Sequence, residues 1–213
     1  MTNSTETTRR VLLEVRDVVA HYGRIQALHG VSLVVHEGEL VTLLGSNGAG
    51  KTTYFNLISG QLTASSGSVV KDGTDITALS PSSRAHHGLG RAFQLTNLFP
   101  QLTVLENIRL AVQARSGDGW SMFRPVTGFR QLTQKAEHYL EATRLTAVAH
   151  QPAANLPHGD QRKLEVAMLL AMEPGIFMFD EPTAGMSVDE APVILELIAR
   201  IKQDTSRTIL LVE

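Results

Sequence analysis

The sequence predicts an α/β fold with a mostly parallel sheet, an antiparallel β part near the N-terminus and a helical part in the middle. Short apolar runs typical of buried strands alternate with helical patterns along much of the chain. This alternation favours parallel strands joined by crossover helices. Between about residues 101 and 150 the pattern is helical alone, which indicates a separate helical lobe.

Composition places the chain among globular proteins. Its 213 residues can bury a core, and 43% apolar with 19% charged residues is not a disordered composition. No apolar run approaches the roughly 20 residues that span a bilayer, and Glu14 interrupts the first run, so we expect no signal peptide. The net charge of −2 gives no general reason to bind nucleic acid, and the absence of cysteine rules out disulfides and thiolate metal sites.

The N-terminal half predicts several strands and two helices. Apolar bursts at 11–19 and 31–35 indicate two strands, with HYGRIQA as the turn region between them. GELVTLLGSNGAGKTTYFNLISG then predicts a buried strand, a glycine-rich loop and a helix that ends near Gly60. GSVVKDGTDIT predicts a hairpin that turns at Asp72-Gly73, and PSSRAHHGLGRAFQ predicts a short helix and a strand.

The C-terminal half follows the helical middle, which is broken at RSGDGW and RPVTG. Residues 160–172 predict a strongly amphipathic helix, and GIFMFDE predicts a buried strand that ends in two acids. A further helix is expected at about 189–203, and RTILLVE is expected to form a final strand.

The glycine-rich loop fits the pattern G-x-x-x-x-G-K-[ST], with a predicted strand before it and a helix after it. Its glycines let backbone N–H groups surround an oxyanion, to which the helix N-terminus adds its dipole. In this pattern Lys51 reaches the β- and γ-phosphates and the Thr52 hydroxyl binds Mg²⁺. A glycine-rich connector that matches by chance is the alternative, which the strand–loop–helix context disfavours. The sequence therefore predicts a site for ATP and Mg²⁺ formed by Gly45, Ser46, Asn47, Gly48, Ala49, Gly50, Lys51, Thr52 and Thr53.

Two acids end the buried strand FMFDE. Asp180 is placed to hold Mg²⁺, directly or through water, as in other P-loop nucleotide hydrolases. Glu181 is a candidate general base, because a carboxylate beside the γ-phosphate can polarise the attacking water. The alternative is a pair of acids that merely face solvent, and the glycine loop favours the functional interpretation.

In this order the motifs resemble the ATPase subunits of ABC transporters, from about residue 11 to the end of the chain. The resemblance implies a P-loop NTPase (RecA-like) core in which Tyr22 stacks on adenine and Glu181 is the catalytic base. It also implies that Gln94, in GRAFQLTNLF, is the Q-loop glutamine that contacts Mg²⁺ and the attacking water and faces the transmembrane partner. The alternatives are that Tyr22 is an ordinary loop aromatic and Gln94 a surface amide.

The resemblance also divides the chain, as one ABC ATPase domain over 1–213. It implies a flexible tail at 1–10, a β subdomain with the phosphate loop at 11–94, a helical subdomain at 95–160 and a return to the core at 161–213. In the family a histidine that contacts the γ-phosphate directly follows the strand matching TILLVE. Because this chain ends at Glu213, we expect the C-terminal part of the cassette, with that histidine, to be missing.

LPHGDQ lies where the family keeps its signature, usually L-S-G-G-Q, which closes over the γ-phosphate held by a second subunit. Leu156 and Gly159 match, whereas Pro157 removes a hydroxyl and a backbone N–H. His158 replaces a glycine and can add a donor, more so when protonated near a triphosphate, and Asp160 replaces glutamine. We predict a working but altered signature; a plain helix cap is the alternative. The N–H groups expected to bind the partner's phosphate are those of Gly159, Asp160 and Gln161.

Within the family, GLGRAFQLTNLFPQLTVLENIRLA and LPHGDQRKLEVAMLLAMEPGIFMFDEPTAGMSVDE look most like the ATPases of branched-chain amino acid importers, with urea and short-amide importers close behind. Ser187 stands where many members carry an aspartate, with Asp189 following, so contacts across the dimer are expected to differ. This branch implies a peripheral protein on the cytoplasmic face of the membrane. Its implied partners are a second ABC ATPase, identical or different, two transmembrane permeases and an extracytoplasmic solute-binding protein, and no nucleic acid.

Other functions use the same loop. A soluble cassette ATPase acting on ribosomes or DNA usually carries two cassettes or a long coiled coil, and this chain shows one phosphate loop and no heptad run. A binding-only cassette with weak hydrolysis stays open, because of Pro157 and the expected missing histidine. A small-molecule kinase would not need the series formed by Gln94, the signature and the D-loop after DEPTAGMS.

Overall fold

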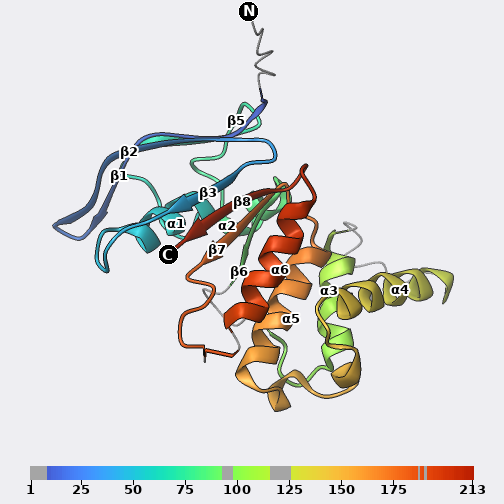
Figure 1. Cartoon of the computed structure of the whole chain (residues 1–213). Coiled ribbons are helices and arrows are strands. Elements are labelled where there is room, and N and C mark those ends of the chain that lie inside the picture. Colours follow the sequence, from blue (N-terminus) through green and yellow to red (C-terminus); the bar gives the residue numbers. More distant parts are fainter. Residues whose placement is uncertain (1–8, 93–97, 116–125, 187, 190) are drawn as a thin grey trace, which may run out of the picture.

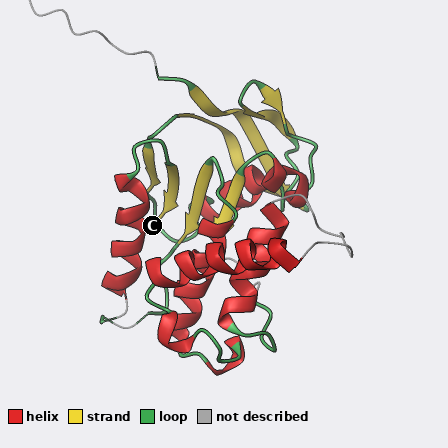
Figure 2. Ribbon diagram, turned by 90° about the vertical axis from the view of Figure 1, so that its right-hand side faces the viewer, coloured by secondary structure: helices red, strands yellow, loops and turns green. Residues whose placement is uncertain are grey.

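Two four-stranded sheets and a helical lobe make up the structure, a computed structural model that describes residues 9–92, 98–115, 126–186, 188, 189 and 191–213. In Figure 1 the antiparallel sheet lies at the upper left and helices α3 and α4 lie at the right, with the parallel sheet between them. Figure 2 shows the strands gathered above and most helices below. The predicted α/β architecture with a β part and a helical part is confirmed.

The antiparallel sheet is built on a long hairpin. Its turn is only Gly23 and Arg24, because Tyr22 already pairs with Ile25. The predicted turn region HYGRIQA is therefore too long, since most of it extends the two strands. The second hairpin turns at Asp72 and Gly73, as predicted, and both have positive φ angles, 50° and 76°, which suits a tight hairpin turn. In spatial order the strands are β2 (Ile25–His36), β1 (Val11–Tyr22), β4 (Ser66–Lys71) and β5 (Thr74–Asp75).

The second sheet is parallel, and its central strand is fully buried, as the apolar run IFMF predicts. Alternate residues of that strand point to opposite faces. Ile176 and Met178 pack in one cluster with side chains of α1, whereas Phe177 and Phe179 pack with α5 and α6. In spatial order the strands are β3 (Leu40–Leu43), β8 (Thr208–Val212), β7 (Ile176–Asp180) and β6 (Leu89–Ala92).

Helices follow the predicted order with two differences at their starts. The last of the helical lobe begins at His158 rather than at residue 160, and it is buried on two sides rather than strongly amphipathic. It packs on the helical lobe through Leu164 and on the sheet through Val166. Another helix begins inside the predicted break RPVTG. The helices are α1 (Lys51–Ser59), α2 (Pro81–His86), α3 (Val104–Arg115), α4 (Val126–Ala142), α5 (His158–Ala171) and α6 (Ala191–Gln203), with short 3-10 turns η1 (Thr146–Val148) and η2 (Ala153–Asn155).

None of the helices within the described ranges is long and apolar enough to cross a bilayer.

Candidate nucleotide site

The glycine-rich loop runs from the end of β3 to the first turn of α1. Gly48 and Gly50 have φ angles of 84° and 86°, a left-handed conformation that side-chain-bearing residues avoid. A Cβ at Gly50 would lie 3.0 Å from the carbonyl oxygen of Ala27, so the loop also passes close to β2. The Ala49 N–H donates to the Ser46 carbonyl at 3.1 Å, which curls the loop on itself. The loop therefore has the tight backbone that its glycines predict.

The start of α1 is prepared for an anion. Gly50 caps the helix without a side-chain hydrogen bond, and the first turn contains no acid. The first intrahelical N–H to find a partner is that of Tyr54, which donates to Gly50 at 2.8 Å, so the N–H groups of Lys51, Thr52 and Thr53 have no acceptor within the helix. Unpaired N–H groups and the helix dipole together favour a phosphate.

Lys51 lies folded over this loop. Its ammonium donates to the carbonyl of Gly45 and, at 3.2 Å, to that of Ser46. The Lys51 ammonium thus already lies within the loop where it is predicted to bind phosphate. Thr52 lies one residue further into the helix and is exposed, so its hydroxyl can reach a bound metal or phosphate.

A small cavity of about 200 Å³ lies against the loop and is lined in part by Gly50, Lys51 and Tyr54. The Tyr54 hydroxyl is buried and has no hydrogen-bond partner among the described residues. Burial raises the pKa of this phenol well above its ordinary value, so it is neutral near neutral pH.

Asp180 ends β7 with its side chain 7% exposed, and it is paired with Arg91 of β6, whose Nη2 lies 2.5 Å from Asp180 Oδ2. The other carboxylate oxygen, Oδ1, is buried and has no partner within the described ranges. Burial lowers the pKa of Arg91, and the hydrogen bond and charge of Asp180 oppose that shift. An oxygen that is buried, charged and still free to accept is what a hard cation such as Mg²⁺ requires.

The described residues contain no cluster of three or more histidines or acids that could hold a metal by itself. A magnesium ion at this site would therefore be held as it commonly is in phosphate-transfer enzymes, by substrate phosphates and one or two protein oxygens. Asp180 and Thr52 supply oxygens of that kind.

Glu181 follows β7 directly and has a φ of 45°, an unusual conformation for glutamate. Two backbone hydrogen bonds hold this conformation. The Glu181 N–H donates to the Val212 carbonyl at 3.1 Å, and the Glu181 carbonyl accepts the N–H of Ala184 at 3.0 Å. The side chain is exposed. Left-handed side-chain-bearing residues cluster at functional sites, so this geometry fits the general base that the sequence predicts.

Tyr22 stands at the end of β1 beside the hairpin turn, with half of its surface exposed. An exposed ring there is free to stack on a base, and stacking on adenine stays a prediction. Gln94 lies outside the described residues, and so does Ser187, whereas Asp189 is exposed in a turn before α6.

LPHGDQ forms the entry to α5. Leu156 is buried, Pro157 caps the helix without a side-chain hydrogen bond, and Gly159 is buried in the first turn. Because the helix begins two residues earlier than predicted, the N–H of Gln161 is already used, donating to the Pro157 carbonyl at 3.0 Å. The prediction that Gln161 offers a free N–H is therefore wrong. The N–H groups without an intrahelical acceptor are those of His158, Gly159 and Asp160.

Side chains near this turn are engaged with one another. Gln161 Nε2 donates to the carbonyl of Leu156 at 2.9 Å, and Lys163 Nζ contacts Asp160 Oδ1 at 2.7 Å. The Asp160 carboxylate in the first turn stabilises the helix dipole and so offsets part of its attraction for another anion.

Sequence reasoning missed Arg91. Its partner Asp180 is 89 residues away, and the sequence around Arg91 does not indicate which residue it pairs with. A signal was nevertheless present, because Arg91 is the one cation of a short buried strand, LGRA, and a buried arginine requires a partner.

Together, the strand–loop–helix, the lysine within it and the buried acid at the end of β7 in the same parallel sheet define a nucleotide-binding protein of the P-loop class. The family model for ABC transporters matches residues 28–184, and the chain belongs to this family, whose activity is ATP hydrolysis.

Relatives and solved structures agree with that assignment. The chain is 34% identical over 209 residues to the high-affinity branched-chain amino acid transport ATP-binding protein BraF of Pseudomonas aeruginosa, covering 96% of this chain and 82% of the relative. It is 35% identical over 207 residues to LivG of Escherichia coli, which has the same description, covering 95% and 81%. A solved ATP-binding cassette of an ABC transporter, MJ1267 in its ADP conformation, matches with a TM-score of 0.78 and 29% identity, over 95% of this chain and 81% of that one.

Proposed function

We propose that this chain is the ATP-binding and ATP-hydrolysing subunit of an importer for branched-chain amino acids or related small solutes. The observation that carries the proposal is the loop geometry, two left-handed glycines and a lysine folded over an acid-free helix start, in a chain similar to BraF and LivG over 95% of its length or more.

In the proposed mechanism the loop binds the phosphates. Its backbone N–H groups and those at the start of α1 surround phosphate oxygens, and Lys51 moves from the carbonyls of Gly45 and Ser46 to the β- and γ-phosphates. Bound Mg²⁺ would neutralise charge on those phosphates, and Thr52 and Asp180 would hold it.

Glu181 supplies the base. Backbone hydrogen bonds to Val212 and Ala184 hold its main chain, and its exposed carboxylate accepts the proton of a water that attacks the γ-phosphate in line. Gln94 is proposed to contact the same water and the metal, and Tyr22 to stack on the adenine.

The proposed assembly pairs this chain with a second cassette, identical or different, under two permeases fed by an extracytoplasmic solute-binding protein. The LPHGDQ turn would meet the γ-phosphate bound by the other cassette, through the N–H groups of His158, Gly159 and Asp160. A solved cassette of similar fold, 25% identical with a TM-score of 0.78, is a dimer bound to ADP and phosphate, which supports this arrangement. The chain would then work at the cytoplasmic face of the membrane as a peripheral subunit.

Uptake measurements in cells test the proposed solute. Replacing the gene by its Lys51→Ala version should abolish high-affinity uptake of labelled leucine, isoleucine and valine, and the wild-type gene should restore it. Unchanged uptake of all three, together with lost uptake of urea or a short amide, would move the assignment to those solutes. Unchanged uptake of every solute would contradict an importer function.

A further inference from the structure

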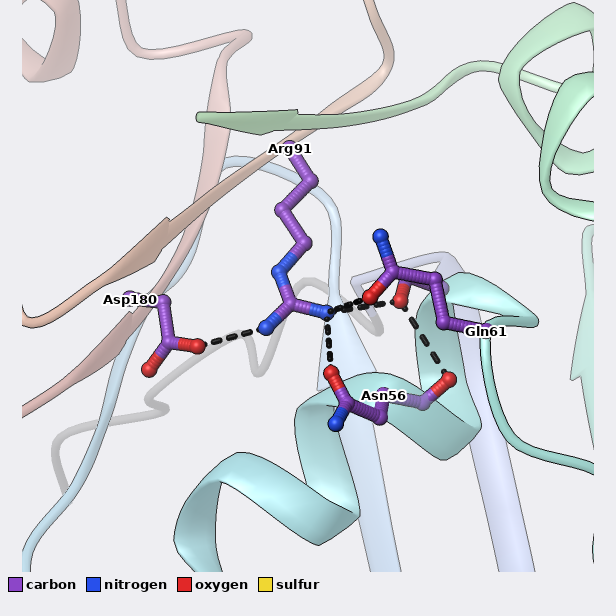
Figure 3. Close-up of polar contacts among 5 residues, drawn as sticks. Asn56, Gln61, Arg91 and Asp180 are labelled. Carbon is purple, nitrogen blue, oxygen red and sulfur yellow. Dashed lines mark hydrogen bonds and ion pairs between the residues drawn. The ribbon is translucent and has the colours of Figure 1, made fainter. Parts of the chain in front are cut away.

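Arg91 lies between the predicted magnesium aspartate and the helix of the phosphate loop (Figure 3). One end of its guanidinium donates to Asp180 Oδ2 at 2.5 Å. The other, Nη1, donates to Asn56 Oδ1 and Ser59 Oγ, both at 2.8 Å, and to Gln61 Oε1 at 3.3 Å. The guanidinium carbon lies 5.4 Å from the centre of the Phe55 ring, and the side chain is only 8% exposed.

These contacts follow from the periodicity of the elements. In the parallel sheet Arg91 pairs with Met178, so its side chain lies on the same face as Asp180, two residues further along β7. That face is the one covered by α1. On α1, Thr52, Asn56 and Ser59 are spaced by four and three residues and share one side of the helix.

As a consequence, Arg91 connects the two residues whose oxygens are predicted to bind Mg²⁺, Thr52 and Asp180. Thr52 stands at the start of the helical row that Arg91 binds through Asn56 and Ser59, and Asp180 stands at the other end of the guanidinium. A planar guanidinium has a fixed donor geometry, so it can hold both elements at one separation. Because Arg91 takes Oδ2, it leaves Oδ1 of Asp180 buried and without a partner in the described part of the chain.

We propose that Arg91 is a positioning residue that sets the separation of Thr52 and Asp180 and aims Asp180 Oδ1 at the metal of a bound Mg–nucleotide. This inference rests on the proposed function, since it presumes that the metal is held at Asp180. Arg91 contacts neither nucleotide nor metal; it acts through the carboxylate.

Arg84 provides a matched control. It too is a buried arginine that binds the C-terminal end of α1, donating to the carbonyls of Leu57 at 2.6 Å and Ile58 at 2.7 Å. In the described structure it forms no ion pair with Asp180. Removing either arginine disturbs the support of α1, but removing Arg91 alone releases the aspartate.

The test measures how much magnesium strengthens nucleotide binding. Titration calorimetry with the non-hydrolysable ATP analogue AMP-PNP, in Mg²⁺ and in EDTA, gives two dissociation constants and their ratio for each protein. For Arg91→Met we expect the magnesium gain to fall about tenfold, the usual effect of losing a residue that orients a metal ligand, with little change in EDTA. For Arg84→Met we expect the wild-type ratio.

Arg91→Lys keeps a cation at Asp180 but cannot span to Asn56, so it should lose a similar share of the gain; it decides the matter if Arg91→Met does not fold. A wild-type ratio in either folded Arg91 variant, or an equal loss in Arg84→Met, would overturn the positioning role. If the wild-type protein binds no AMP-PNP in either condition, the proposed function itself falls, and the wild-type titration alone reveals that.

Discussion

Two helices of this chain begin at a turn that contains glycine, and they differ in the charge around their first N–H groups. At α1 the cap is a left-handed Gly50, the first residue is Lys51, and no acid lies in the first turn. At α5 the cap is Pro157, and Asp160 lies in the first turn, paired with Lys163 at 2.7 Å. Both helix starts leave N–H groups without an intrahelical acceptor, but only at α1 is no acid beside them; at α5 the carboxylate of Asp160 already lies in the first turn.

The difference indicates a division of labour. The α1 loop can hold a triphosphate within one chain, because its N–H groups, dipole and cation add together. The α5 turn offers three N–H groups with an acid among them, so its attraction for phosphate is weaker. In the proposed assembly it would therefore meet a nucleotide that a second cassette already holds.

The largest expected effect is on the rate of hydrolysis of the ATP bound at the α1 loop. Glu181→Gln should slow ATP hydrolysis about a hundred- to ten-thousandfold while keeping ATP affinity, because it removes a general base and preserves size. Phosphate release and calorimetry measure the two quantities. Glu173→Gln is the matched control, a glutamate of equal φ, 45°, at the opposite end of β7, and it should hydrolyse normally. Unchanged hydrolysis in Glu181→Gln would remove it from the catalytic role.

The next prediction tests directly whether the starts of α1 and α5 differ in their affinity for ATP. Lys51→Ala should weaken ATP binding by roughly 3 kcal/mol, or about a hundredfold, since hydrogen bonds to a charged group are lost. Lys163→Ala, the corresponding change near the start of α5, should leave the affinity of a single chain unchanged. Calorimetry on dilute protein checks both. Equal losses would show that the two helix starts do not differ as proposed.

A smaller effect is expected at the adenine. Tyr22→Ala should weaken ATP binding by about 1–3 kcal/mol, by analogy with base–aromatic stacking, and should weaken inorganic triphosphate binding much less. Competition with a fluorescent nucleotide measures both ligands. Equal weakening of ATP and triphosphate, or no weakening, would assign Tyr22 to the hairpin turn alone.

The smallest effect sharpens the account of α5. Asp160→Asn removes the acid from its first turn and should strengthen ATP-dependent association of two cassettes by about 0.3–1 kcal/mol. Light scattering on Glu181→Gln protein with ATP, with and without the change, measures the association. Glu137→Gln, an exposed acid on α4, is the charge-matched control. Weaker association with Asp160→Asn would mean that Asp160 contacts the partner directly.

Local signals explain which elements could be predicted. Asp72-Gly73 defines its hairpin through positive φ angles, and Gly60 ends α1 in a left-handed cap, as glycine commonly does. The phosphate loop was predictable for the same reason, since its chemistry is contiguous in sequence. The acids of β7 could be placed because a buried apolar strand precedes them.

The errors lie where distant contacts decide. The turn between β1 and β2 has two residues rather than the predicted seven-residue region HYGRIQA, because strand pairing continues to Tyr22 and Ile25. The predicted start of α5, residue 160, is two residues too late, because Pro157 caps the helix and Gly159 is buried in its first turn. Arg91 was missed because its role depends on a sheet neighbour far along the chain.

Amide spectroscopy on glycine-labelled protein tests the division of labour most directly. With ¹⁵N-glycine in the Glu181→Gln protein at a dilution where it is monomeric, Mg–ATP should shift the amide signals of Gly48 and Gly50 and leave that of Gly159, identified by Gly159→Ala, in place. At concentrations where two cassettes associate, Gly159 should shift as well. A shift of Gly159 in the monomer, or no shift of the loop glycines, would contradict the account.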